Sequence, residues 1–488
     1  MAALAGLMTA GAPASVWAQD LFNPFDVGGG LLSAPPPGTT LRAGVPGTSV
    51  AADGETAAGA RGGDGAGRRD EGRGPVFTLD LSTGIRYEEE EDEPTEAFWR
   101  TRADLEAFAE TRNQRFTFGF GAELRAEEGM TDISRPTAGL NYQLFNRSTA
   151  FEADLTWREV DVDSGFLPED FDADDIDRGE GTRETHAARF TLETGLDARF
   201  GTRTVLAYRQ TDFTDTVDPD LVNEIRYDAS TELRFSIDRR IQVTAFAEWS
   251  EESEDDAMET VETNTRFGVG ADLLIDRVWS ANIDLAFAEE EIETTGGTVV
   301  TEGAVIDLRL VRDMRNGSLS FSANHNGTED ISSFTAARRL ALANGASVSA
   351  ELGLISFEDG DVLPTVGLTY RNEILRGRTV TLSLRQSGTE NDDDEAIFRT
   401  VLNAAYRQEL TRNSQFGVNG AIVAVTPQEG GDPDTLAASL GVSYSHDLTR
   451  DWALVARADA RQTFEDGTRT DRSGVFSVNL ERTFSFRP

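Results

Sequence analysis

Histidine and cysteine, the residues most often used for acid–base and nucleophilic chemistry, are rare in this chain of 488 residues. There is no cysteine, and the three histidines are His186, His325 and His446. A hydrolytic site needs a nucleophile or an activated water, a base and a group that orients the base. His446 lies near a short turn, whereas His186 and His325 lie near long loops on distant segments. The three histidines are therefore not expected to form one site, and we expect no enzymatic activity.

An acidic run at residues 161–180 is the best candidate for a metal site, because hard oxygen ligands suit Ca²⁺. Its carboxylates include Asp161, Asp163, Glu169, Asp170, Asp172, Asp174, Asp175 and Asp177. The run does not match the EF-hand loop, whose fifth and sixth positions are an oxygen ligand and a glycine. Counted from Asp172 the fifth position is Ile176, and counted from Asp170 the sixth is Asp175. A solvated acidic loop is the favoured interpretation, and Ca²⁺ binding is the alternative.

Composition excludes several other functions. The formal net charge is −41, which argues against nucleic acid as a partner, since phosphates require a basic patch. Every cationic side chain apart from histidine is an arginine, so a phosphate-binding Walker lysine and a Schiff-base lysine are both impossible. No glycine-rich phosphate loop or metal-spaced set of His and Cys occurs either, and we expect no cofactor.

Alternating apolar and polar residues dominate the chain after Pro75. In the segment 77–87 the residues Phe77, Leu79 and Leu81 alternate with Thr78 and Asp80. The same period of two returns in segments 116–125, 225–235, 279–287 and 452–460. Successive side chains of a β-strand point to opposite faces, so each segment predicts a strand with one apolar and one charged face. The mean hydropathy of −0.38 is compatible with a membrane barrel, because such strands alternate lipid-facing and polar residues.

The connections between these segments also alternate. Ten short turns rich in Arg, Asn and Asp are predicted near residues 112, 147, 199, 239, 277, 316, 345, 377, 412 and 450. Longer, mostly acidic loops are predicted at residues 88–93, 161–180, 251–256, 289–293 and 390–395. Short turns on one rim and long loops on the other are typical of outer-membrane barrels. The pattern predicts an all-β, antiparallel up-and-down transmembrane β-barrel of about 22 strands, within a range of about 18 to 22.

Aromatic residues distinguish this prediction from a soluble β-sandwich, solenoid or propeller, which would also alternate. They lie on the apolar face close to strand ends, as interfacial girdles do. These residues are Tyr87, Trp99, Tyr142, Trp157, Tyr227, Trp249 and Tyr370. The polar face carries charge in strand after strand, with little sign of a second core. Both features favour the membrane barrel.

Two segments resemble known outer-membrane proteins. The closing segment 476–486 is similar to the C-terminal strand that the barrel-assembly machinery reads, although the chain continues with Arg487 and Pro488 instead of ending on an aromatic. The turns at 410–413 and 448–452 resemble those of porin-like barrels associated with exopolysaccharide export, which implies passive or export transport. Residues 324–327 are similar to the His-x-Ser-Asn-Gly pattern of outer-membrane phospholipases. The serine is absent there, so an exposed loop-edge histidine is favoured.

The chain before the barrel divides into two parts. Residues 1–18 predict a secretory signal peptide, with an apolar stretch at 4–10 and small residues at 16 and 18. Residues 19–74 are rich in Gly and Pro and predict a flexible periplasmic segment, and residues 75–488 predict the barrel. TonB-dependent receptors hold a folded plug in a barrel of this size. Residues 19–74 are too short and too poor in apolar residues for such a plug, although they could thread the lumen as an extended chain.

The expected function is a porin-like channel for passive passage or export of hydrophilic solutes in the cell outer membrane. An exopolysaccharide-export barrel with periplasmic partners and a structural or adhesive surface barrel are the alternatives. Expected partners are outer-membrane lipids and lipopolysaccharide, the latter bridged by divalent cations, and the barrel-assembly machinery. The predicted pore-lining residues are Arg86, Arg102, Asp104, Glu123, Arg125, Glu152, Asp154, Arg189, Glu193, Arg226, Asp228, Arg266, Asp272, Arg309, Arg399 and Arg457.

Overall fold

The computed structural model describes residues 74–90, 95–127, 130–162, 181–216, 221–342, 345–357, 362–390, 396–427, 434–465 and 467–487. The predicted signal peptide, residues 19–73 and the acidic run from 163 to 180 lie outside these ranges. In the described part of the chain, no helix is long and apolar enough to cross a membrane.

The described residues form 22 β-strands. Their bounds are β1 (Val76–Glu90), β2 (Glu96–Glu110), β3 (Gln114–Glu127), β4 (Met130–Phe145), β5 (Thr149–Asp161), β6 (Thr182–Thr194), β7 (Phe200–Thr214), β8 (Glu224–Ser236), β9 (Ile241–Glu254), β10 (Val261–Leu274), β11 (Trp279–Thr294), β12 (Gly297–Met314), β13 (Gly317–Asn326), β14 (Ile331–Ala341), β15 (Ser347–Ser356), β16 (Val362–Leu375), β17 (Arg378–Glu390), β18 (Ala396–Thr411), β19 (Ser414–Pro427), β20 (Thr435–Asp447), β21 (Trp452–Glu465) and β22 (Thr468–Phe486).

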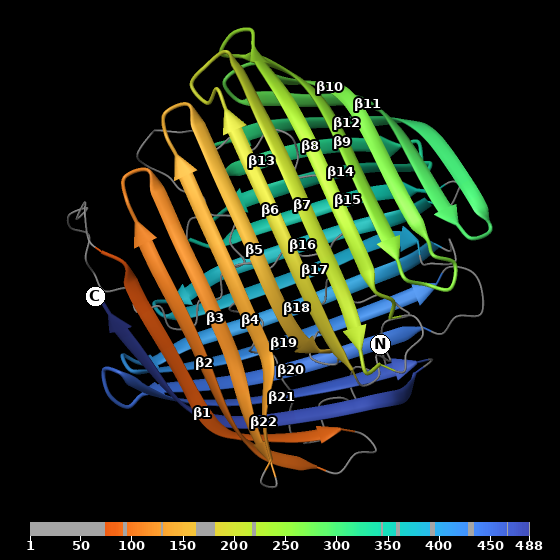
Figure 1. Cartoon of the computed structure of the whole chain (residues 1–488). Helices are drawn as coiled ribbons and strands as arrows, with labels where there is room; N and C mark the ends of the chain where they lie inside the picture. The colour runs from red at the N-terminus through yellow and green to blue at the C-terminus, as the bar shows by residue number, and fades with distance from the viewer. Residues whose placement is uncertain are drawn as a thin grey trace.

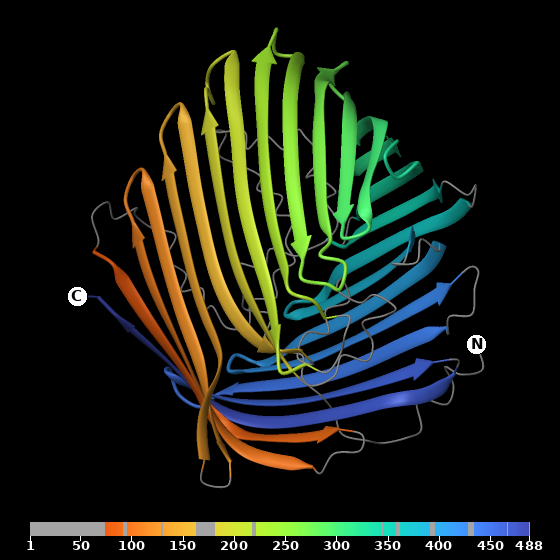
Figure 2. The ribbon, with the colours of Figure 1, turned by 45° about the vertical axis from the view of Figure 1, so that its right-hand side comes forward.

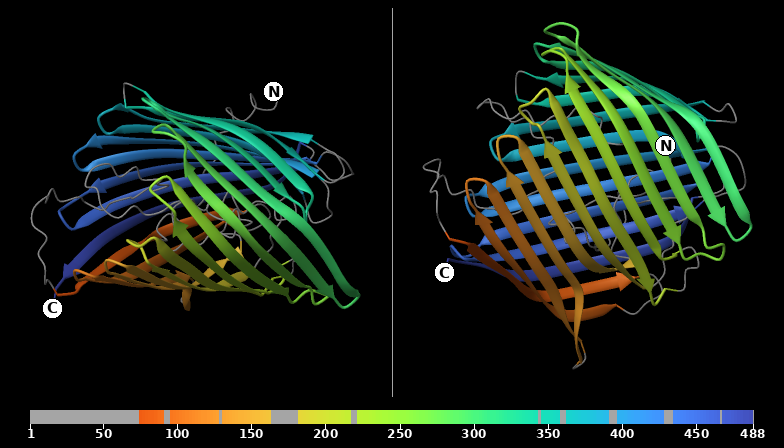
Figure 3. Two further views of the ribbon diagram at one scale, coloured as in Figure 1. Left: turned by 90° about the horizontal axis from the view of Figure 1, so that it is seen from above. Right: turned by 45° about the horizontal axis from the view of Figure 1, so that its top comes forward.

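The strands close into one antiparallel barrel. Each strand pairs with the strand before it and the strand after it, and β1 pairs with β22 over the register from Phe77↔Phe486 to Glu90↔Ser473. In Figure 1 the near wall, which contains β2–β8, crosses the far wall at a large angle, as the tilted strands of a barrel do. Figures 2 and 3 show the same ring of tilted strands from other sides. The predicted fold class is confirmed, with 22 strands.

The ten short turns are also where the sequence places them, all on one rim. Asp276 shows how such a turn is held: its Oδ1 accepts hydrogen bonds from the backbone amides of Val278 at 2.7 Å and Trp279 at 2.9 Å. Asp238 caps the preceding turn in the same way, through the amides of Arg240 and Ile241. A short polar side chain that satisfies two amides replaces backbone bonds that the turn cannot make.

These hydrogen bonds predict a pH dependence. The amides of Val278 and Trp279, and the charge of Arg312, hold the pKa of the exposed Asp276 carboxyl below its usual value. A lowered pKa stabilises the fold above the ordinary Asp pKa of about 3.9, and this contribution is lost as pH falls through the lowered value. We expect Asp276→Asn, which keeps an acceptor but does not ionise, to lose less stability than the wild type on acidification. Urea unfolding midpoints of the two proteins at about pH 6 and about pH 3 measure the difference, and equal losses would contradict it.

The opposite rim differs from the prediction. Residues 289–293 were expected in a loop but lie within β11, and residues 251–254 lie within β9. Here β11 and β12 are joined by a two-residue connection at Thr295 and Gly296. Backbone pairing continues past the apolar part of each strand, where the charged side chains are only partly buried. The acidic residues of this rim are therefore partly strand tips instead of loops.

Candidate functional site: the charged lumenal wall

The two faces of the wall are distinguished by how exposed their side chains are. Ile85 and Trp99 are paired across β1 and β2 and are 49% and 50% exposed, respectively. On the opposite face of the same strands, Arg86 is only 4% exposed and Arg100 6%. Side chains crowd on the concave face of a barrel and spread apart on its convex face. The apolar face is therefore the exterior and the charged face lines the lumen.

Following the strand register around the barrel assigns each predicted pore-lining residue to a face. All sixteen lie on the same face as Arg86, which is the lumenal face. They do not form one site, because they are spread over ten strands. Three groups of ion pairs and hydrogen bonds on β1 to β12 include most of them, whereas Arg399 and Arg457 lie on β18 and β21, outside these groups.

The first group lies close to where β1 meets β22. Arg86, Arg100 and Glu123, called here the closure cluster, come from β1, β2 and β3. Arg100 Nη1 lies 3.6 Å from Glu123 Oε2, and all three side chains are buried, Glu123 to 3% exposure. Arg86 also pairs with Glu88. Two buried guanidinium groups are stable side by side only where carboxylates offset their charge, so Glu123 stabilises this part of the wall.

Next to the closure cluster the pairs are more exposed. Arg102 contacts Asp104 within β2 at 2.9 Å. Arg125 of β3 reaches Glu96 of β2 at 2.5 Å, and its guanidinium lies 3.8 Å from the ring centroid of Phe98. This stacking on an inward-facing aromatic holds the Arg125 side chain against the wall.

The second group lies on β4 to β7, where carboxylates accept hydrogen bonds from side-chain amides or pair with arginines. Asp154 and Glu152 accept hydrogen bonds from Asn141, and Glu152 also accepts one from Gln143 at 2.6 Å. Glu193 lies 3.3 Å from Arg203. These contacts fix the carboxylates along the wall instead of leaving them to extend into the lumen.

The third group makes the wall from β8 to β12 the most acidic part of the lumen. Arg226 pairs with Glu252 at 2.5 Å, and Arg266 lies 2.8 Å from Asp307 and 4.0 Å from Glu248. On the lumenal face of β9 to β11, Asp272, Asp284, Glu262 and Glu290 add further negative charge. Carboxylates thus outnumber arginines on this wall.

Asp284 is the most buried carboxylate on this acidic wall, at 1% exposure. It lies against Gly270 of β10: a Cβ there would come within 1.9 Å of its Oδ1. The glycine therefore provides the space that lets Asp284 lie flat in the wall. Four lumenal residues were not predicted from the sequence: Asp284, Glu248, Asp307 and Arg100. Each lies an even number of residues from a predicted lumenal residue or its strand partner, so the same alternation could have found it.

The lumenal face is not charged all the way round, in contrast to the expectation from the sequence. Ile397, Val423, Val425 and Ala437 of β18 to β20 form a buried apolar cluster on it, with Val401 packed alongside. The remaining lumenal residues of β19 and β20 are mostly Gly, Ser and Asn. Alternation predicts which face a residue takes, but not that the inward faces of β19 and β20 carry no charge apart from Asp447 at the end of β20.

The histidines lie far from one another on the exterior face. His186 of β6 is 3.0 Å from Glu184 and stacks on Trp157, with ring centroids 6.5 Å apart. His325 of β13 shares a hydrogen bond with Ser332, and His446 is on β20. Among the described residues, no group of three His, Cys, Asp or Glu side chains is arranged to hold a metal ion. The candidate calcium ligands from residue 163 to 177 lie outside those residues.

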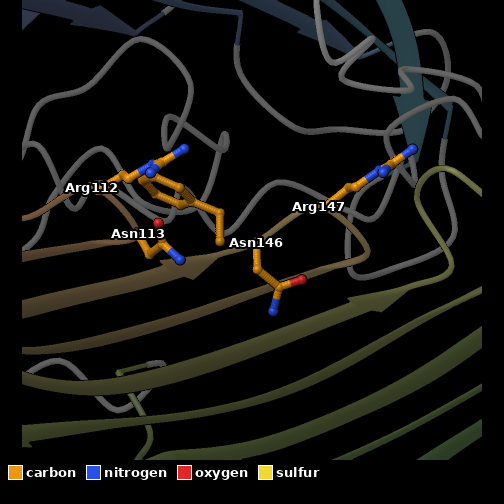
Figure 4. Close-up of a pocket in the computed structure, with 5 residues that line it drawn as sticks. Arg112, Asn113, Asn146 and Arg147 are labelled. Atoms are coloured by element: carbon orange, nitrogen blue, oxygen red, sulfur yellow. The ribbon is translucent and has the colours of Figure 1, made fainter.

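A shallow pocket of about 470 Å³ lies on the short-turn rim (Figure 4). It is lined by Arg112, Asn113, Phe145, Asn146 and Arg147 from two adjacent turns. Arg147 is engaged with Asp197 at 3.0 Å. The pocket belongs to the rim and not to the lumenal wall.

Comparison with known proteins identifies the fold. The Fiu ferric-catecholate import receptor of E. coli K12 matches with a TM-score of 0.57 and 9% identity over 86% of this chain and 82% of its own. The FrpB iron transporter of Neisseria meningitidis matches with a TM-score of 0.58 and 7% identity, over 84% and 81%. A variant of the ferric enterobactin receptor PfeA of Pseudomonas aeruginosa matches with a TM-score of 0.54 and 8% identity, over 85% and 81%.

No protein-family model and no curated protein matches the sequence. The structural matches show that the chain has the fold of bacterial outer-membrane barrels of 22 strands. That fold, with its apolar exterior, places the chain in the outer membrane.

Proposed function

We propose that this protein is a passive channel for hydrophilic solutes across the outer membrane. The observation that carries the proposal is the lumenal face, where fixed charges of both signs extend over most of the 22 strands. Barrels of this strand number enclose a lumen wide enough for an aqueous passage unless something occupies it. Ion pairs held flat against the wall line the passage with charge without filling it.

Liposome swelling tests the proposal directly. Liposomes that contain the refolded protein should swell in isotonic solutions of small uncharged sugars, at a rate that falls as the sugar becomes larger. Protein-free liposomes provide the baseline. A swelling rate equal to that baseline for every sugar would contradict passive passage.

The acidic wall of β8 to β12 and the acidic long-loop rim favour cations. We expect the triple variant Glu248→Gln, Asp272→Asn and Asp307→Asn to lower the cation-to-anion permeability ratio by roughly twofold or more. The amides keep the hydrogen bonding of the carboxylates while removing their charge. Reversal potentials in a salt gradient measure the ratio, and an unchanged value would show that this wall does not set selectivity.

A second candidate is uptake of an iron chelate by a gated receptor, which the ferric-receptor matches favour. Structural matches with sequence identities below 10% show a shared fold but do not show a shared ligand. Growth of a deletion strain under iron limitation separates the two functions: a specific defect favours the receptor, and normal growth with reduced solute entry favours the channel. Polysaccharide export, which the turn resemblance implies, would instead appear as lost polymer in that strain.

We also propose that the barrel interacts with the barrel-assembly machinery and with lipopolysaccharide. β22 is the strand that completes the barrel by pairing with β1, and its exterior face carries Phe476, Leu480 and Phe484. An exposed apolar face on the closing strand is what assembly in a membrane requires.

A further inference from the structure

Charged side chains on the exterior face are separated by sign. Among the residues whose side chains the structure describes, the strand register assigns nine carboxylates to that face, and all lie toward the long-loop rim. They are Glu89, Glu159, Glu184, Asp212, Glu251, Glu289, Glu291, Glu293 and Glu302. The side chains between them and the opposite rim are apolar or uncharged, as the hydrocarbon region requires.

Exterior arginines lie at the other end of the strands. Arg312, Arg338, Arg378 and Arg482, called here the arginine belt, are each within four residues of the short-turn end of β12, β14, β17 or β22. Arg469 and Arg472 also face outward, but they lie toward the long-loop rim, where Arg472 pairs with Glu89 at 3.7 Å. The belt is therefore specific to the short-turn rim, which faces the periplasm in barrels of this class.

Two members of the arginine belt share one arrangement. Arg312 is paired in register with Trp279, the first residue of β11, and its guanidinium lies 5.3 Å from the indole centroid. Arg482 is paired with Trp452, the first residue of β21, at 5.0 Å, and also lies 4.2 Å from the ring of Phe484. Each guanidinium is thus held over a tryptophan at the depth where tryptophans meet the lipid headgroups.

The belt arginines form no direct ion pair among the described residues, and the Asp276 carboxylate of the neighbouring turn interacts with Arg312 only at longer range. None of the ion pairs within 4.0 Å in that part of the chain involves Arg312, Arg338, Arg378 or Arg482. Arg338 donates instead to the amide oxygen of Asn316 at 3.1 Å. A fixed guanidinium that no carboxylate contacts directly can still offer its planar donors to phosphate oxygens.

We propose that the arginine belt binds the phosphate groups of anionic phospholipids in the periplasmic leaflet of the outer membrane. The belt lies on the lipid-facing exterior at headgroup depth, where phospholipid phosphates are the abundant anions. The carboxylates toward the other rim would repel the same lipids, so the exterior charge selects between the two leaflets. The proposal concerns the outside of the barrel and does not depend on what passes through the lumen.

Lipid retention tests the proposal. The refolded protein is placed in vesicles of equal phosphatidylcholine and phosphatidylglycerol and extracted in mild detergent, and the two lipids that remain bound are counted by mass spectrometry. The wild type should retain more phosphatidylglycerol than phosphatidylcholine. Arg312→Gln, Arg338→Gln and Arg482→Gln together should remove this preference, with an effect of about fivefold in affinity for each arginine.

Two further variants complete the test. Arg472→Gln removes an exterior arginine outside the belt and should retain phosphatidylglycerol as the wild type does. A triple variant with lysine in place of Arg312, Arg338 and Arg482 keeps the charge and should recover most of the preference for phosphatidylglycerol. Equal retention of the two lipids by the wild type, an unchanged preference in the triple Gln variant, or an equal loss in Arg472→Gln would each overturn the proposal.

Discussion

Replacing Glu123 by Gln should lower the free energy of unfolding by about 3 kcal/mol, among the largest effects expected of any single lumenal substitution. Glu123 is the ion-pair partner of the buried Arg100 and lies near the buried Arg86, so the variant leaves Arg100 without that partner and Arg86 with Glu88 alone. Removing one partner of a buried pair costs more than the pair itself contributes. Urea unfolding of the refolded protein, followed by tryptophan fluorescence, measures the loss.

Glu96→Gln is the matched control. Glu96 pairs with Arg125 on the same two strands, but both side chains are more than a third exposed. An exposed pair contributes about 0 to 1 kcal/mol, so this variant should unfold almost as the wild type does. Equal losses in the two variants would mean that burial does not decide the stability of the wall.

The second large effect should come from Leu402→Arg, which we expect to destabilise the barrel by about 2 to 4 kcal/mol. Leu402 lies on the exterior face of β18, paired with Leu384 and Ile422. An arginine there has to enter the hydrocarbon region. Folding yield and unfolding free energy in vesicles measure the effect.

Asn403→Arg places the same side chain one residue further along β18, on the lumenal face. Because successive residues of a strand face opposite sides, this arginine should be accommodated with little loss of stability. A greater loss in Asn403→Arg than in Leu402→Arg would contradict the assignment of the two faces.

The sequence predicts the strand count and the faces because both follow from local rules. Alternation of period two assigns Phe77 and Asp80 to opposite faces of the strand, whatever the exact position of the strand ends. Asp276 identifies its turn because its side chain makes hydrogen bonds to backbone amides within four residues. The sixteen predicted lumenal residues have the expected parity for the same reason.

Features that depend on neighbouring strands could not be predicted in the same way. Asp284 is buried because Gly270 of the neighbouring strand β10 leaves space for it, and the pairing of these two residues is known only from the strand register. The apolar cluster around Val423 requires three adjacent strands in place. The charge at the tip of β11 suggests a loop, because local composition does not show that β12 continues the pairing.

Ion conductance in a planar bilayer tests the central claim most directly. The refolded protein from residue 19 onward, with and without residues 19–74, is added to the bilayer and single-channel current is recorded. An open channel predicts stepwise conductance from the longer protein, with a preference for cations, and similar steps after the deletion. Silence of the longer protein would contradict an open passage: steps that appear only after the deletion would make residues 19–74 a plug, and silence of both proteins would leave a gated or closed barrel.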